Sequence, residues 1–184
     1  AVDGEVIEDR SVDNLSSLSA SVPNFYVAET QIDTTISIRG VRSGANKGFE
    51  QSVPLNFDGI TYPRSQLART PLVDLERVEV LRGPQPTLFG KNAIGGVVSV
   101  TSAKPTEEFE GKFSTSHESE HDESQSLLVL SGPLSENVLG RLTISTREMD
   151  GWIINENMKR IEPQRDETYI RGQLAWTSGN VDYN

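Results

Sequence analysis

The sequence contains no cysteine, no long apolar run and no excess of basic residues, and each absence removes a class of function. Without cysteine among its 184 residues, the chain has no disulfide framework, no thiolate metal site and no cysteine nucleophile. The longest apolar runs, around Val97-Val98 and at residues 127–130, fall far short of the roughly 20 residues of a membrane-spanning helix. The formal net charge of -10 argues against nucleic-acid binding, because phosphate backbones repel an acidic surface.

The acidic side chains are concentrated in the second half of the chain. Residues 1–106 hold 12 acidic and 10 basic side chains, whereas residues 107–184 hold 15 acidic and 7 basic ones. The composition therefore changes near Lys104-Pro105-Thr106, and the sequence predicts two structural units that meet there.

The first half is predicted to form a small α+β domain. Ser11 is a suitable N-cap for a helix that ends at Pro23, because apolar residues recur between them at helical spacing. After this helix, the sequence alternates between short turns and runs of β-branched residues, which predict strands. We expect strands at residues 25–27, 35–39, 53–60, 77–81 and 97–101, a hairpin turn at 58–59, and a short helical turn at 87–89.

Four segments of the second half alternate polar and apolar side chains with the period of a β-strand. They lie at residues 109–116, 125–134, 138–147 and 168–177. In the third segment Leu142 and Ile144 share one face, while Arg141 and Thr143 share the other. Soluble sandwiches and transmembrane barrels both contain such segments, so the alternation alone leaves the two architectures open.

The lengths of the connections favour the barrel. The link between the second and third segments, Ser135 to Asn137, is short, whereas the links on the other side are longer. Short turns at one end and long loops at the other are typical of outer-membrane barrels. Because four strands cannot close a barrel of eight or more, this interpretation predicts that the chain is a piece of a longer protein.

One long motif ends the first half. It reads LERVEVLRGP at residues 75–84 and TLFGKNAIGGVVSVT at residues 87–101. Three shorter pieces precede it: VPNF at residues 22–25, ISIRGVR at 36–42 and FDGI at 57–60. With these motifs, residues 5–106 resemble the plug domain of TonB-dependent outer-membrane receptors of the siderophore and iron-uptake type. Residues 107–184 are similar only in kind to the first strands of the receptor barrel.

The resemblance implies a fold and a location. Residues 1–106 would form the plug domain, α+β with a mixed sheet and short helices. Residues 107–184 would supply the first antiparallel strands of a truncated transmembrane barrel of about 22 strands. The receptor would lie in the outer membrane of a Gram-negative cell, with the plug in the barrel lumen, facing the periplasm. The family's TonB box lies upstream of the first plug strand, and we expect it to be missing from this chain, which begins Ala1-Val2-Asp3-Gly4.

The resemblance also implies a function. Receptors of this family are transporters, not enzymes, and need no cofactor: they bind a scarce nutrient and import it, while the plug gates the pore and contributes to the ligand site. The implied partners are TonB, outer-membrane lipid and a small ligand, an iron–siderophore complex above all, and no nucleic acid. The alternative is a soluble α+β binding or adhesion module with an attached β-sheet.

Candidate site residues are assigned by matching this motif to the family. Loops at residues 41–49, 60–69 and 89–93 would point outward, and the ligand-proximal side chains would be Arg39, Tyr62, Arg64, Phe89 and Lys91. Cationic and aromatic groups suit an anionic, aryl-bearing iron chelate. Charged residues within the strand of residues 75–82 need partners, either across the plug surface on the inner barrel wall or in solvent: Arg77, Glu79 and Arg82.

Two other patterns suggest sites that we discount. Six residues separate Gly83 from Gly90-Lys91, whereas a phosphate loop needs four and a following hydroxyl residue. His117 and His121 lie among acidic residues and would ligate a metal if the segment were helical, but serine and charge density favour a solvated loop. We therefore predict no metal site, and no grouping of serine, histidine and carboxylate indicates catalysis.

Overall fold

The computed structural model describes residues 1–10, 12–29, 34–42, 50–62, 68–120, 122–162, 164–178 and 181–183. The chain divides into two units, Ala1–Ala103 and Lys104–Asn184. Each unit has its own sheet and is described by itself.

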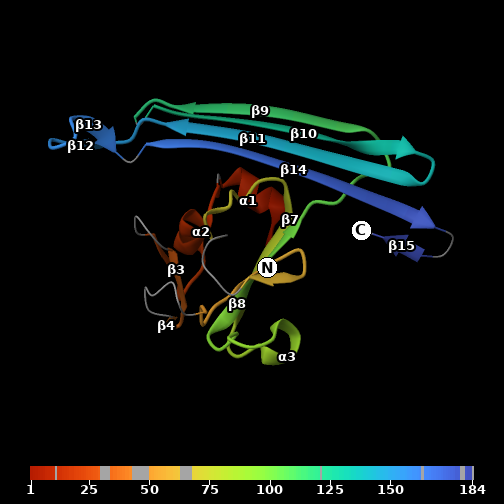
Figure 1. Ribbon diagram of the computed structural model, residues 1–184, viewed down its shortest axis with the longest axis horizontal. Helices are drawn as coiled ribbons and strands as arrows, with labels where there is room; N and C mark the ends of the chain where they lie inside the picture. The colour runs from red at the N-terminus through yellow and green to blue at the C-terminus, as the bar shows by residue number, and fades with distance from the viewer. Residues whose placement is uncertain are drawn as a thin grey trace. The chain divides into compact units, whose positions relative to one another are not determined.

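The first unit is built around a five-stranded mixed sheet (Figure 1). Its strand order is β1-β7-β8-β5-β6; β5 and β8 run parallel, and the other neighbouring strands run antiparallel. The bounds are Val2–Asp3 for β1, Leu55–Phe57 for β5, Ile60–Tyr62 for β6, Leu75–Arg82 for β7 and Gly96–Ser102 for β8. Central β8 is the most deeply buried of them, which explains its run of valines at residues 97, 98 and 100.

A smaller antiparallel sheet and three short helices complete the first unit. The sheet contains β2 (Phe25–Glu29), β3 (Thr34–Ile38) and β4 (Val41–Arg42), and the helices are α1 (Gly4–Asp9), α2 (Leu15–Ser21) and α3 (Pro86–Phe89). Apolar side chains from both sheets and from α1 and α2 form one hydrophobic core. Its members include Ile7, Leu15, Leu18, Phe25, Ile36, Ile38, Leu55, Val78, Val98 and Val100.

The helix predicted between Ser11 and Pro23 begins later than expected. Asn14 is the N-cap of α2: its Oδ1 accepts from the Ser17 backbone N–H at 2.8 Å, and Ser17 Oγ accepts from the Asn14 N–H at 3.2 Å. This reciprocal capping box satisfies two N–H groups at the helix start. Ser11 lies outside the described residues. Helix α1 was not predicted, because six residues are too few to show helical periodicity.

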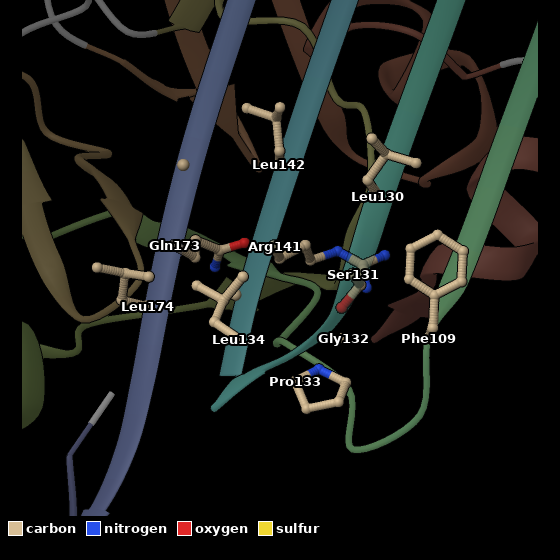
Figure 2. A pocket seen from close by; sticks show the side chains of 12 residues that line it. Phe109, Leu130, Ser131, Gly132, Pro133, Leu134, Arg141, Leu142, Gln173 and Leu174 are labelled. Atoms are coloured by element: carbon tan, nitrogen blue, oxygen red, sulfur yellow. The ribbon is translucent and has the colours of Figure 1, made fainter. Parts of the chain in front are cut away.

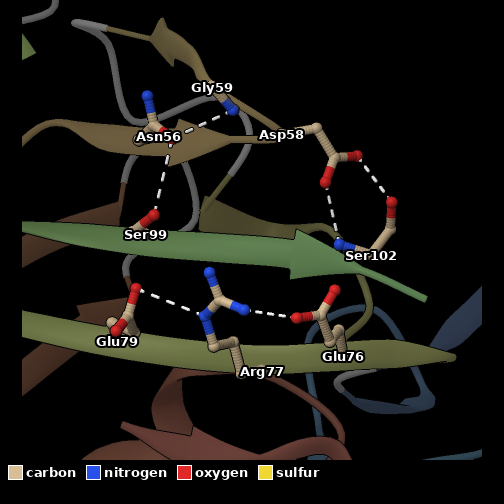
Figure 3. A network of polar contacts seen from close by, with 8 residues as sticks. All are labelled: Asn56, Asp58, Gly59, Glu76, Arg77, Glu79, Ser99 and Ser102. Carbon is tan, nitrogen blue, oxygen red and sulfur yellow. Dashed lines mark hydrogen bonds and ion pairs between the residues drawn. The ribbon is translucent and has the colours of Figure 1, made fainter. Parts of the chain in front are cut away.

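The β5–β6 hairpin is fastened to the last strand of the first unit (Figure 3). Asp58 adopts φ of +49° and Gly59 φ of +82°, as a two-residue hairpin turn requires. The Asp58 carboxylate accepts the Ser102 backbone N–H at 2.8 Å and the Ser102 hydroxyl at 2.7 Å. The hairpin turn therefore holds the C-terminal end of β8 in place.

Removal of the Asp58 carboxylate should loosen this end of the sheet. Asp58→Ala leaves the Ser102 donors without their acceptor and places alanine at a positive φ, so we expect a loss of about 1–3 kcal/mol in local stability. Hydrogen exchange of the β8 amides measures this loss. Asp58→Asn is the control, because it retains an acceptor oxygen and tolerates positive φ; equal exchange in both variants would contradict the assignment.

The second unit contains a five-stranded antiparallel sheet with the order β15-β14-β11-β10-β9. In Figure 1 the four long strands β9, β10, β11 and β14 lie side by side. Their bounds are Glu110–Glu118 for β9, Glu123–Ser135 for β10, Val138–Met149 for β11, Arg165–Ser178 for β14 and Val181–Tyr183 for β15. The four strands predicted from alternation are thus confirmed, each lengthened at one or both ends.

The two connections on either side of β11 differ in length. Between β10 and β11 the chain turns at Glu136-Asn137. Between β11 and β14 it forms an additional hairpin of β12 (Ile153–Asn155) and β13 (Arg160–Glu162). No helix in the described part of the chain is both long and apolar enough to span a membrane.

Candidate functional site

Several loops of the first unit meet at one end of its main sheet. At this end β5 and β8 begin, and β6 and β7 finish. We call it the α3 end and define it as residues 39–42, 50–54, 62 and 82–95. The turn after β3 belongs to it because Ile38 Cδ1 would lie 2.8 Å from a Cβ on Gly96.

Close backbone approach holds the α3 end together. Ser52 O accepts hydrogen bonds from the N–H groups of Ile94 at 3.2 Å and Gly95 at 3.0 Å. A Cβ on Gly95 would lie 2.9 Å from Val41 Cγ1 and 3.0 Å from Val53 Cγ2. Glycine is therefore required where these three segments pack, which gives a structural reason for one glycine of the motif.

An acidic residue organises the tip of this end. Lys91 Nζ lies 3.1 Å from Glu50 Oε1, and Asn92 Nδ2 donates to the other Glu50 oxygen. The Lys91 side chain is 81% exposed, so its charge is available to a ligand. Sequence reasoning missed Glu50, because 40 residues separate it from Lys91 and no local pattern joins them.

A buried amide lies beside this acidic residue. Gln51 is only 4% exposed, and within the described part of the chain its side-chain carbonyl oxygen has no hydrogen-bond donor. An unsatisfied buried acceptor costs about 1–3 kcal/mol. Such groups are rare in stable cores, and sequence reasoning did not single out this residue.

The structure brings four of the five predicted ligand-proximal residues to the α3 end. Arg39 is exposed in the turn after β3, and Tyr62 ends β6 opposite Leu55. Phe89 is the last residue of α3 and is half-buried, and Lys91 follows it. The fifth residue, Arg64, lies outside the described residues. Contact of these side chains with a ligand stays a prediction.

The three predicted plug–barrel residues of β7 have different surroundings, and Figure 3 shows those of Arg77 and Glu79. Arg77 lies between two acidic residues of its own strand: it binds Glu76, and its Nε is 3.5 Å from Glu79 Oε2. Arg82 is exposed at the other end of β7, opposite Gly96, and therefore belongs to the α3 end. Contact of Arg77, Glu79 and Arg82 with a barrel wall stays a prediction.

The first unit separates its charges along the sheet. The α3 end carries the cationic side chains Arg39, Arg42, Arg82 and Lys91 together with Glu50. At the opposite end acidic side chains outnumber basic ones: Asp3, Glu5, Asp58, Asp74 and Glu76 lie there together with Arg77. Clustered cations beside aromatic rings attract and bind anionic ligands, so the α3 end is suited to an anionic, aromatic compound.

The sheet of the second unit is inverted relative to that of a soluble protein. Its apolar face is exposed, with Ile170 at 64% and Leu174 at 60%, whereas Thr143 on the opposite face is fully buried. The other side chains of the exposed apolar face include Phe113, Leu130, Leu142 and Trp176. A soluble sheet buries its apolar face and solvates its polar one, so this sheet is built for apolar surroundings on its exposed side.

The exposed face also changes in polarity along the strands. From Trp176, β14 places Leu174, Gly172 and Ile170 on this face, and then Thr168 and Asp166. The paired β11 positions follow the same gradient and finish at Thr146 and Glu148. Trp176 and Thr168 are about 26 Å apart along the strand, or about 20 Å at a tilt of about 40°, close to the apolar band of a membrane barrel.

Charged residues on the opposite face pair with one another. Arg147 Nε lies 2.8 Å from Glu123 Oε1 across the β10–β11 pair. On β14 the Arg171 guanidinium lies 5.9 Å from the centre of the Tyr169 ring. This face therefore retains polar side chains in half-buried surroundings by pairing them.

The described residues contain no group of three or more histidines and acidic residues that would hold a metal ion. His117 Nδ1 lies 3.0 Å from Ser124 Oγ across the β9–β10 pair. His117 is thus on a strand, not on the helix that a metal pair at this spacing would need, and His121 lies outside the described residues.

Comparisons with known proteins agree with both units. The family model described as TonB-dependent Receptor Plug Domain matches residues 1–97. The pesticin receptor of Yersinia pestis is 32% identical over 152 residues, 81% of this chain and 22% of the relative. The ferrienterobactin receptor of Escherichia coli (strain K12) is 30% identical over 142 residues, 72% of this chain and 19% of the relative. The chain thus spans about a fifth of the length of these relatives.

A solved structure matches nearly the whole chain. It is the ferric yersiniabactin uptake receptor FyuA from Yersinia pestis, with a TM-score of 0.88 and 27% sequence identity. The match covers 97% of this chain and 28% of the other, so it includes residues of both units.

Proposed function

The chain belongs to the TonB-dependent receptors, and from this premise we propose that its protein imports an anionic iron chelate, a ferric siderophore, into the cell. The predicted fold class is confirmed: an α+β plug with a mixed sheet, followed by antiparallel strands like those of a receptor barrel. The relatives are outer-membrane receptors, and this chain is likewise assigned to the outer membrane.

The exposed apolar face of the second unit's sheet is the observation that supports a membrane transporter over a soluble binding module. A soluble adhesion module would bury Ile170, Leu174 and Trp176, whereas these side chains are exposed on one face. Lipid is the surroundings that such a face requires. As a TonB-dependent receptor in the membrane, the protein is proposed to move its ligand across it, with the plug gating the pore.

The cationic α3 end supports an anionic cargo. Arg39 and Lys91 are exposed at this end, which also includes the half-buried aromatic residues Tyr62 and Phe89. Catecholate and phenolate groups of iron chelates would find both charge and ring contacts at such a surface. The names of the relatives, which mention ferrienterobactin and ferric yersiniabactin, agree with this chemistry.

Energy for import is proposed to come through TonB. Family membership implies dependence on TonB. The protein is proposed to have no catalytic role, since its task is binding and passage of an intact ligand.

Charge reversal at Lys91 should weaken binding of the ferric chelate. Lys91→Glu replaces an exposed cation at the α3 end and creates a second carboxylate beside Glu50, so we expect the affinity to fall about three- to tenfold. The defect should shrink as salt is raised, because the exposed charges are screened. Fluorescence titration of the purified full receptor with a panel of ferric siderophores measures the affinity.

A matched control separates the site from overall charge. Arg10→Glu makes the same change in net charge at an exposed residue that follows α1 and should bind as the wild type does. Equal losses in both variants would show that net charge, not the α3 end, attracts the ligand.

Growth under iron limitation tests the transport function itself. A strain that lacks the full-length gene should fail to grow on at least one ferric siderophore that supports its parent. Normal growth of the deletion strain on every chelate of the panel, with normal uptake of labelled iron, would overturn the proposed cargo.

A further inference from the structure

An open hollow of about 620 Å³ lies on the apolar face of the second unit's sheet (Figure 2). Its volume falls within the roughly 300–1,000 Å³ of small-molecule sites. The hollow is lined by residues of β10, β11 and β14 and by Phe109, which precedes β9: Phe109, Leu130, Ser131, Gly132, Pro133, Leu134, Gly140, Arg141, Leu142, Gly172, Gln173 and Leu174.

The floor of the hollow is open at one glycine, Gly172, whereas the Leu134 side chain covers Gly140 and Phe109 covers Gly132. Leucines form the walls. Gly132 and Gly140 are directly paired across β10 and β11, and Gly172 on β14 is paired with Leu142. A Cβ on Gly172 would meet nothing within 4 Å, so the space above it is open. In Figure 2 the side chains of Leu130 and Leu142 lie on one side of the hollow, and those of Leu134 and Leu174 on the other.

The polar residues of the lining do not face this space. Ser131, Arg141 and Gln173 alternate with the apolar residues of their strands, and they belong to the opposite face. Ser131 Oγ bonds Thr106, and Arg141 Nη1 donates to the Lys104 carbonyl at 3.2 Å. The hollow therefore offers a ligand apolar contacts, which suits a hydrocarbon chain and gives no partner to a headgroup, a peptide or a siderophore.

We propose that the hollow binds one acyl chain of a phospholipid from the periplasmic leaflet. This inference rests on the proposed place of the sheet in the outer membrane. The hollow is continuous with the exposed apolar band and lies beside the short turn at Glu136-Asn137. Short turns of outer-membrane barrels are periplasmic, and the periplasmic leaflet of that membrane consists of phospholipid. The open position at Gly172 lets the acyl chain lie against the backbone there, where it gains more contacts than on a flat wall.

Photo-cross-linking tests this site in the full receptor. The protein is reconstituted in nanodiscs that contain phosphatidylethanolamine with a diazirine in the acyl chain, and the labelled peptides are identified by mass spectrometry. We expect labelling to concentrate in residues 130–142 and 172–174. Gly172→Leu places its Cβ in open space and its side chain in the hollow, and should lower this labelling about fivefold.

Thr168→Leu is the matched control. It adds the same kind of side chain to the same face of β14, four residues from Gly172 and outside the hollow, so labelling of residues 130–142 should stay at the wild-type level. Both variants should bind ferric siderophore like the wild type, because neither changes the α3 end. This binding also shows that they are folded.

The outcomes separate this inference from the proposed function. Equal labelling of the hollow and of Phe113, Ile144 and Ile170 would overturn the acyl-chain site but leave the sheet in the membrane. No labelling of either region would overturn the membrane placement itself. A wild-type dimer that Gly172→Leu converts to monomers would make the hollow a contact between two receptors, and would also overturn the proposal.

Discussion

Ile170→Arg is expected to cost the receptor about 2–4 kcal/mol of folding free energy in a bilayer. Ile170 is 64% exposed and lies in the apolar part of the β14 face, between Leu174 and Thr168. On a soluble sheet, arginine at so exposed a position would be neutral or stabilising. In lipid it must lose its hydration or deform the bilayer around it. Reversible unfolding of the full receptor in lipid vesicles, followed by denaturant titration, gives the difference.

The depth dependence of this cost is as informative as its size. Asp166→Arg changes the same strand and the same face, but at the charged end of the polarity gradient. A substitution near the interface should cost only about 0–1 kcal/mol. If both arginine substitutions had the same small cost in the bilayer, the exposed apolar face would not face lipid. That result would favour the alternative, a soluble binding or adhesion module.

Gly96→Ala is expected to be the most damaging small substitution in the plug. Gly96 starts β8 at φ of +145°, and a Cβ there would lie 2.2 Å from the Leu81 carbonyl oxygen. The conformation alone costs about 1–3 kcal/mol for other residues, and the clash is with backbone paired to β8, which has little room to move. We expect a local destabilisation of about 4 kcal/mol or more. Hydrogen exchange of β7 and β8 amides in the full receptor measures it.

Gly90→Ala is the control that separates the cost of a positive φ from the cost of a steric clash. Gly90 also has a positive φ, +77°, but a Cβ there would meet nothing within 4 Å. Its cost should therefore stay within about 1–3 kcal/mol, and the β7–β8 amides should remain protected. If the two alanine variants behaved alike, the close approach of the Leu81 carbonyl would not be the reason for glycine at position 96.

The sequence predicted the strands better than the helices, for a physical reason. Strands of ten or more residues show several periods of alternation, and the apolar positions of β11 and β14 are therefore plain. Helix α1 has six residues and was not predicted, because so short a segment shows no helical periodicity. The short helical turn predicted at residues 87–89 is confirmed by α3, Pro86–Phe89. Capping decided where α2 begins, because Asn14 and Ser17 form a reciprocal pair at the helix start.

The candidate site was only partly accessible from the sequence. Arg39, Phe89 and Lys91 were found because they lie in or beside a long motif. Glu50, Gln51 and the position of Arg82 at the α3 end emerge only when strands distant in sequence are brought together. The sequence also could not predict which face of the second unit's sheet is exposed, because a soluble sheet and a lipid-facing sheet show the same alternation of polar and apolar residues.

The polarity of the exposed sheet has a consequence for export. Because lipid-facing side chains occur at every second position of β11 and β14, the unfolded strands carry no continuous apolar stretch. An inner-membrane translocon retains chains by such stretches. Before it folds, this segment therefore lacks the signal for retention in the inner membrane. The chain as a whole is polar, with a mean hydropathy of -0.42. The continuous apolar surface forms only when the strands pair. The unfolded chain can therefore cross the inner membrane, and the folded protein can still reside in the outer membrane.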